Sequence, residues 1–170
     1  MTATALPLVP PAARVAGRAV LTAALTVWLL DGLFATSLCL AVSPGCTVVR
    51  TWQGVAGALV GRPATFRGGA TTFALGLALH FCVALEWSAL YALLLARWDA
   101  LARFTARPAN ALLAGLALGA VVWCVMDFLV MPLTRNAPTP FGSRAWWLLL
   151  AGHLVVVGPP IALIVRRRRE

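Results

Sequence analysis

The sequence predicts an all-α protein, a polytopic bundle of four transmembrane helices. Hydrophobic residues make up 61% of the 170 residues and charged residues only 11%, whereas soluble domains carry about 25% charged residues. A water-soluble globule of this size could not keep that much apolar surface away from solvent. The apolar residues also gather into four long runs, and most arginines stand at the ends of these runs. Both observations indicate that a lipid bilayer surrounds the helices.

The chain divides into two short tails and one membrane domain. Residues 1–13 contain three prolines and no amphipathic period, which predicts a disordered cytoplasmic tail. A cleaved signal peptide is the alternative for the first apolar run, but the run continues well past Asp31 and no clear Ala-x-Ala cleavage site follows it. The transmembrane domain is expected at residues 14–165 and a basic tail at residues 166–170. The four spans are expected at about residues 19–42, 69–96, 109–132 and 145–165.

The first outer loop, about residues 43–68, is long for so small a protein. Its centre, residues 51–60, is apolar and flanked by Arg50 and Arg62. About ten residues are too few to cross the bilayer, so we expect a short interfacial or re-entrant helix there.

The arginines predict the orientation of the chain and the partners of its surface. With the N-terminus inside, nine of the 14 arginines lie in cytoplasmic segments and five in outer segments. This bias predicts a bacterial inner-membrane protein with both termini in the cytoplasm. No basic stripe is interleaved with aromatic residues, so nucleic-acid binding is not expected; the arginines are expected to contact anionic lipid head groups. A homo-oligomer or another membrane partner stays open.

The cysteines give no motif. Cys82 and Cys124 fall inside apolar runs, where a free cysteine usually acts as a small hydrophobic residue. Cys39 and Cys46 lie near the outer face, and the sequence leaves open whether they form a disulfide.

Two spans carry stripes of small residues, which let helices approach closely in lipid. Every fourth residue of the second span, from Thr72 to Ala96, is small except His80. The third span contains a GxxxG pattern. We expect these two faces to pack on each other, or one of them to form a homo-oligomer contact. The expected packing residues are Gly76, Ala84, Ser88, Gly115 and Gly119.

Ionisable residues inside the spans are functional candidates, because a charge in the hydrocarbon is costly unless it is paired or hydrated. At about 1.5 Å per residue, Asp31 and His80 lie roughly 16 Å below the outer surface, His153 roughly 12 Å and Asp127 roughly 8 Å. We expect these four residues, one from each span, to converge in the outer half of the membrane. Glu86 is secondary: it is expected near the cytoplasmic interface, or paired with an arginine such as Arg18 or Arg166.

Three interpretations of this polar set stay open. The residues form Asp–His pairs that fix the helix packing, or they line a site or path for protons, an ion or a small solute, since histidine changes charge near neutral pH. The third is a metal or haem site in which His80 and His153 from facing helices are the ligands. No serine lies in a nucleophile motif, so hydrolytic or transferase chemistry has no specific support.

Two adjacent prolines predict an irregular helix in the fourth span. Pro159 and Pro160 have no backbone N–H and so remove two hydrogen-bond donors. The carbonyl groups of about Val155 and Val156 lose their helical partners, and we expect a kink one turn below His153.

Several short motifs resemble an uncharacterised family of small bacterial four-span inner-membrane proteins. The motifs are Asp31-Gly32, residues 77–81 (LALHF), residues 126–133 (MDFLVMPL), and His153 with residues 158–163 (GPPIAL). The resemblance covers most of residues 15–165 and implies the four-span architecture. The family usually has asparagine where this chain has Asp127, which argues against a role that needs a charge there. It has no established activity to carry over.

The sequence therefore predicts an integral inner-membrane protein with a non-enzymatic role. Its intramembrane Asp/His cluster is expected to serve packing or the handling of protons or a small solute. No cofactor is predicted; the alternative is a membrane redox component that binds haem b or a divalent metal through His80 and His153.

Overall fold

The computed structural model of the protein describes residues 11–167, and every regular element in that part is a helix. Four of the helical segments are long and apolar enough to cross a membrane. Each of their boundaries lies within two residues of the predicted one, so the all-helical four-span fold is confirmed. The segments are Gly17–Val42, Gly69–Arg97, Pro108–Leu133 and Arg144–Arg166.

The first two spans are continuous helices, α1 (Pro11–Val42) and α4 (Gly69–Arg97). The tail predicted at residues 1–13 is therefore helical from Pro11 on, while residues 1–10 and 168–170 lie outside the described part. The third and fourth spans are interrupted by wider or tighter turns. The third consists of α6 (Pro108–Val125), the π-helical turn η1 (Met126–Val130) and the 3₁₀ turn η2 (Met131–Leu133). The fourth consists of α7 (Arg144–Gly152), the π-helical turn η3 (His153–Val157) and α8 (Gly158–Arg167).

Three short helices connect the spans. The first outer loop forms α2 (Val48–Val60) and α3 (Ala64–Arg67), as expected for a short helix in this loop. The connection between the second and third spans contains α5 (Asp99–Phe104). Side-chain caps define two of the helix starts: Thr47 accepts a hydrogen bond from the Arg50 amide and Ser143 accepts one from the Trp146 amide.

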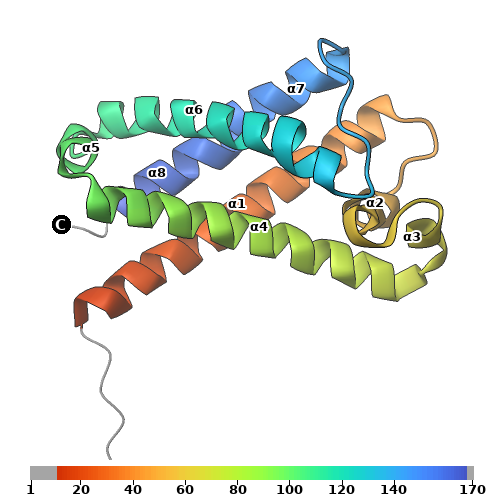
Figure 1. Cartoon of the computed structure of the whole chain (residues 1–170), viewed down its shortest axis with the longest axis horizontal. Coiled ribbons are helices and arrows are strands. Elements are labelled where there is room, and N and C mark those ends of the chain that lie inside the picture. The colour runs from red at the N-terminus through yellow and green to blue at the C-terminus, as the bar shows by residue number, and fades with distance from the viewer. Residues whose placement is uncertain (1–10, 168–170) are drawn as a thin grey trace, which may run out of the picture.

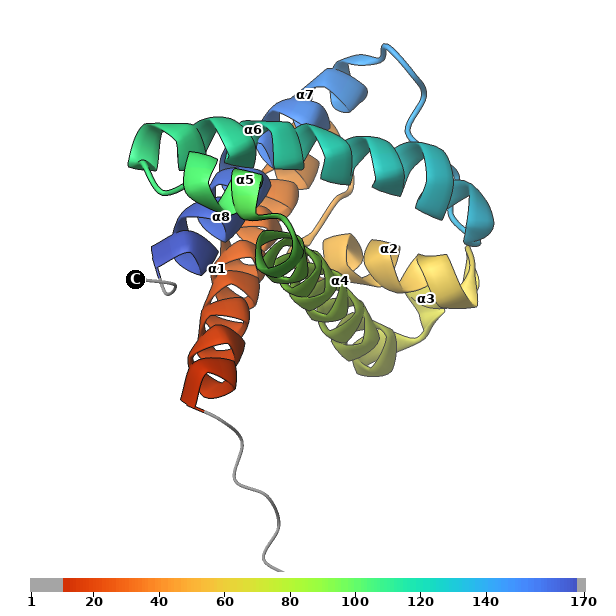
Figure 2. The same cartoon turned by 60° about the vertical axis from the view of Figure 1, so that its left-hand side comes forward.

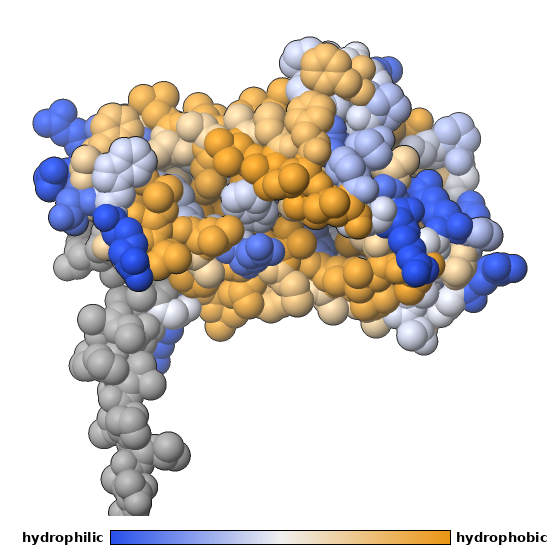
Figure 3. Space-filling view, in the orientation of Figure 1, coloured by the Kyte–Doolittle hydropathy of each residue, from blue (hydrophilic) through white to orange (hydrophobic). Residues whose placement is uncertain are grey.

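The helices form a bundle with two polar ends. Helix α1 begins and α8 ends on the same side as α5, whereas α2, α3 and the connection from η2 to α7 lie on the other side (Figure 1). Helix α2 lies beside α4 (Figure 2). A broad hydrophobic band covers the middle of the molecule and hydrophilic residues gather at both ends (Figure 3). This distribution is compatible with an integral, multi-pass membrane protein.

The two small-residue stripes pack against different partners. A Cβ atom on Gly76 would overlap the backbone carbonyl of Trp52 in α2. A Cβ atom on Gly115 would overlap the backbone at Pro159, and one on Gly119 would overlap the carbonyl of His153. The expectation that the two stripes pack on each other is therefore wrong: α4 packs on α1 and α2, while α6 packs on η3 and α8.

The contact at Gly119 predicts a destabilised variant. Gly119→Ala adds one methyl group where the fourth span leaves no space, and overpacking of this kind costs about 1–3 kcal/mol. We expect a lower thermal unfolding midpoint of the purified protein in detergent. Gly17→Ala is the matched control, because a Cβ atom there meets nothing within 4 Å. An equal midpoint for the two variants would contradict the close packing of α6 on the fourth span.

Candidate functional site

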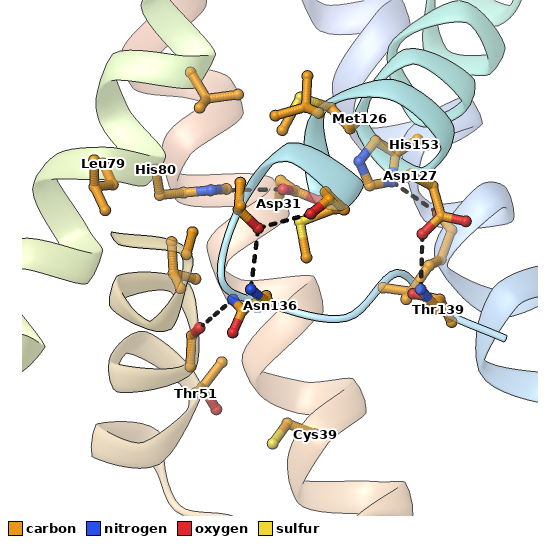
Figure 4. Close-up of a pocket in the computed structure, with 18 of the residues that line it drawn as sticks. Asp31, Cys39, Thr51, Leu79, His80, Met126, Asp127, Asn136, Thr139 and His153 are labelled. Atoms are coloured by element: carbon orange, nitrogen blue, oxygen red, sulfur yellow. Dashed lines mark hydrogen bonds and ion pairs between the residues drawn. The ribbon is translucent and has the colours of Figure 1, made fainter. Parts of the chain in front are cut away.

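A cavity of about 830 Å³ lies among the four spans, on the side of α2. All four predicted polar residues, Asp31, His80, Asp127 and His153, line it (Figure 4). They come from α1, α4, η1 and η3, so each span contributes one of them. The volume is within the range of small-molecule sites, about 300–1,000 Å³.

The lining changes along the cavity. Its outer mouth is formed by the end of α1 and the start of the first outer loop, with Arg50 and Arg62 on its border. The middle level holds the four polar residues. The inner end, about one to two helical turns deeper, has only apolar side chains. The residues of the inner end are Val27, Val83, Ala84, Trp87, Val122 and Val157.

The cavity exists because two neighbouring helices do not pack closely. Helix α4 is held by α1 and α2, and α6 is held by η3 and α8, which leaves α4 and the third span without a packed seam. The surface is hollowed between these two helices (Figure 3). Val83 and Trp87 of α4 and Met126 and Val130 of the third span line the cavity on this side.

Asp31 and His80 face each other inside the cavity. Their carboxylate Oδ2 and imidazole Nε2 are 3.6 Å apart, which exceeds the 2.7–3.2 Å of a good hydrogen bond. The two side chains point toward each other from α1 and α4 (Figure 4). The His80 Nε2 atom is buried and has no hydrogen-bond partner among the described residues. A buried polar atom left in this way costs about 1–3 kcal/mol, so a ligand group or water that completes the pair would be stabilised.

Aromatic packing holds the His80 ring in position. The Trp52 ring contacts His80 edge to face, with ring centroids 5.3 Å apart. Trp52 reaches this position because Gly32 has no side chain: a Cβ atom there would lie 2.7 Å from the tip of the indole. Helix α2, which carries Trp52, therefore helps to orient the His80 ring.

Asp127 is fully satisfied by protein groups. It is 2% exposed and accepts hydrogen bonds from the Thr139 amide at 3.0 Å and from Trp146 Nε1 at 2.9 Å. Its carboxylate is turned away from Asp31, toward the outer loop (Figure 4). Asp127 therefore connects the third span to the loop and to α7, which is a structural role.

His153 faces the cavity with one nitrogen free. Its Nδ1 atom lies 2.8 Å from the Leu149 carbonyl, and its ring packs on Trp123 with centroids 5.0 Å apart. Since the carbonyl can only accept, Nδ1 carries the proton and Nε2 of a neutral ring is an acceptor. His153 begins the π-helical turn η3, which directly precedes Pro159 and Pro160 in α8. The wider turn accommodates the backbone groups that the two prolines leave without helical partners.

Glu86 is separate from the cavity. It is exposed on α4, and the ion pairs of the described residues do not include the alternative that we gave, a pairing of Glu86 with Arg18 or Arg166. Its position near the cytoplasmic interface stays a prediction. The Arg166 guanidinium donates to the Ala106 carbonyl instead. A hydrophilic patch interrupts the hydrophobic band over α4 (Figure 3).

A polar network that the sequence did not reveal fixes the outer wall of the cavity. The Thr65 hydroxyl donates to the Gln53 carbonyl, Gln53 Nε2 donates to Thr72 Oγ1 at 3.3 Å, and the Thr72 hydroxyl donates to the Thr65 carbonyl at 2.7 Å. From the other side, Asn136 Nδ2 donates to the Gly54 carbonyl at 2.9 Å. These bonds attach α2 to α4 and to the second outer loop. Their acceptors are mostly backbone carbonyls, which have no signature in the sequence.

A disulfide lies at the mouth of the cavity. Cys39 at the end of α1 is bonded to Cys46 just before α2, and both residues line the cavity. Cys82 and Cys124 are free and exposed on the spans.

Among the side chains that the structure describes, no three His, Cys, Asp or Glu groups come close enough to share a metal ion. Comparison of the chain with known proteins finds no matching family model, no similar curated protein and no similar solved structure. The functional argument therefore depends on the cavity and its residues.

The two hydrogen bonds that Asp127 accepts predict that this residue keeps the second outer loop in place. Asp127→Ala removes both acceptors, so we expect a loosened loop and faster trypsin cleavage after Arg135 in the purified protein. Thr139→Pro, which removes only the backbone donor, is expected to have a smaller effect of the same kind. Thr139→Ala keeps the backbone donor and is the control, expected to resemble the native protein. Unchanged cleavage in Asp127→Ala would contradict the structural role of Asp127.

Proposed function

We propose that the protein is a multi-pass inner-membrane protein that binds a small amphiphilic molecule in the cavity in its outer half. The observation that carries the proposal is the Asp31–His80 pair, whose buried Nε2 atom faces a mostly apolar cavity without a hydrogen-bond partner. The proposed role is binding or transfer of the molecule, with no covalent chemistry.

The distribution of arginines supports the proposed orientation, with both termini in the cytoplasm. By sequence, the segments predicted to be cytoplasmic contain nine arginines and those predicted to be on the opposite side contain five. The Cys39–Cys46 disulfide lies on the second side. Disulfides persist in oxidising compartments and are rare in the cytoplasm, which favours the periplasmic side for the mouth.

The size of the cavity favours ligand binding over a purely structural role of the polar residues. The open cavity of about 830 Å³ is within the size range of small-molecule sites, about 300–1,000 Å³. The polar residues also divide into two groups. Asp127 is used by the loop, while Asp31, His80 and His153 retain atoms that can hydrogen-bond to a ligand.

Binding can be measured with 12-bromododecanol, whose bromine quenches tryptophan fluorescence, and Trp87 and Trp123 line the cavity. In protein reconstituted into phosphatidylcholine nanodiscs we expect saturable quenching. Asp31→Ala and His80→Ala each remove a polar partner and are expected to weaken the affinity about tenfold, the effect of ~1.4 kcal/mol. Glu86→Gln is the control, because it removes a carboxylate outside the cavity and is expected to leave the affinity unchanged. Quenching that does not saturate in the native protein would sink the proposal.

The second candidate function is a haem or metal site, favoured by one observation: His80 and His153 line the same cavity from different helices. In this arrangement His80 Nε2 faces Asp31, and a haem iron would have to displace that contact. An absorption spectrum with elemental analysis separates the two candidates. We expect a colourless protein without stoichiometric metal. A Soret band that is lost in both His80→Ala and His153→Ala would establish haem binding and replace the first candidate.

A further inference from the structure

Two arginines stand at the mouth of the cavity and share one aromatic ring. Arg50 belongs to α2, Arg62 precedes α3, and both line the cavity. Their guanidinium groups lie over the Phe66 ring at 5.4 Å and 5.5 Å from its centroid. Cation–π contacts of this kind hold the guanidinium groups in place while their N–H donors stay available. Arg50 uses one nitrogen, Nη1, to donate to the Gly45 carbonyl at 3.3 Å.

No acidic residue compensates these charges on the outer side. The segments 43–68 and 134–144 contain five arginines and no aspartate or glutamate. Within the cavity, Asp127 is occupied by the loop and by Trp146. Asp31 lies eight residues along α1 from Cys39, about 12 Å deeper than the mouth. Two cations at one mouth, with no acidic residue in the segments around them, favour binding of an anion there, most of all one with several oxygen acceptors.

We propose that the ligand is an anionic amphiphile: a phosphate or carboxylate group lies in the mouth at Arg50 and Arg62, and an apolar chain occupies the cavity. This inference depends on the proposed binding function and specifies its ligand class. The chain passes the Asp31–His80 level, where a polar group on the chain or a water molecule completes the pair, and it ends among apolar side chains such as Val27 and Trp87. From Cys39 to Val27 the cavity follows twelve residues of α1, about 18 Å, which is long enough for an extended lipid-like chain.

The hollow between α4 and the third span gives such a molecule a route from the bilayer. Its charged group would stay at the level of the outer interface, where the arginines lie, while its chain moves sideways between the helices. The same chemistry is found in the head group of a membrane lipid and in a free amphiphile.

The test compares 12-bromododecyl phosphate with 12-bromododecanol in phosphatidylcholine nanodiscs, again by tryptophan quenching. We expect the phosphate to bind at least tenfold more tightly, and more weakly as ionic strength rises. Arg50→Gln and Arg62→Gln are each expected to weaken phosphate binding about tenfold and to weaken binding of the uncharged alcohol much less. Arg67→Gln and Arg144→Gln are the matched controls, because these outer arginines do not line the cavity.

The outcomes separate this inference from the proposed function. Saturable binding of both probes with equal affinity overturns the anionic ligand and leaves the binding function intact; no saturable binding of either probe overturns both. Displacement of the bromododecyl phosphate by inorganic phosphate alone shows a site for a free anion and overturns the amphiphile. Competition by phosphatidylglycerol in the nanodiscs supports a lipid as the ligand, and absence of that competition supports a free amphiphile.

Discussion

Close backbone contacts at three glycines determine which helices pair, and the rest of the structure depends on that choice. The backbone of α2 packs directly on Gly76, and the backbone of the fourth span packs directly on Gly115 and Gly119. In lipid, apolar burial does not drive helices together, so contacts of this closeness contribute much of the packing energy. Because α2 and the fourth span cover these small-residue faces, α4 and the third span have no such face with which to pack on each other. The cavity lies between them.

The polar residues show how this arrangement divides structural from binding roles. Asp127 finds two donors because the second outer loop and Trp146 fold back over the end of the third span. Asp31 and His80 face the unpacked space, where no protein group completes their contact. The same residue types at similar depth therefore have different roles, which depend on what the neighbouring loop supplies.

The sequence predicted the spans to within two residues and the faces on which small residues lie, because both follow from local composition and helical periodicity. It also predicted that Asp31, His80, Asp127 and His153 lie at similar depth, and they line one cavity. It did not predict the partners. A small-residue stripe indicates close approach but not which helix approaches, and Asp127 is bound by a backbone amide that no residue type identifies. The wall formed by α2 depends on carbonyl acceptors, which are equally invisible in the sequence.

The cavity has a direction, and this limits how a ligand can lie in it. Cationic groups stand only at the mouth, the Asp31–His80 pair lies about 12 Å deeper, and the inner end is apolar. An anionic amphiphile placed the other way round would bury its charge beside Val27 and Trp87, where no cationic residue of the described lining offsets the cost of dehydration. The wall around the mouth is held by the Cys39–Cys46 disulfide and by the hydrogen bonds of α2 to its neighbours. In the part of the chain that the structure describes, no disulfide or hydrogen bond of this kind joins α4 to the third span across the hollow. If the protein binds an amphiphile as proposed, the apolar chain enters through this hollow while the charged group stays at the arginines.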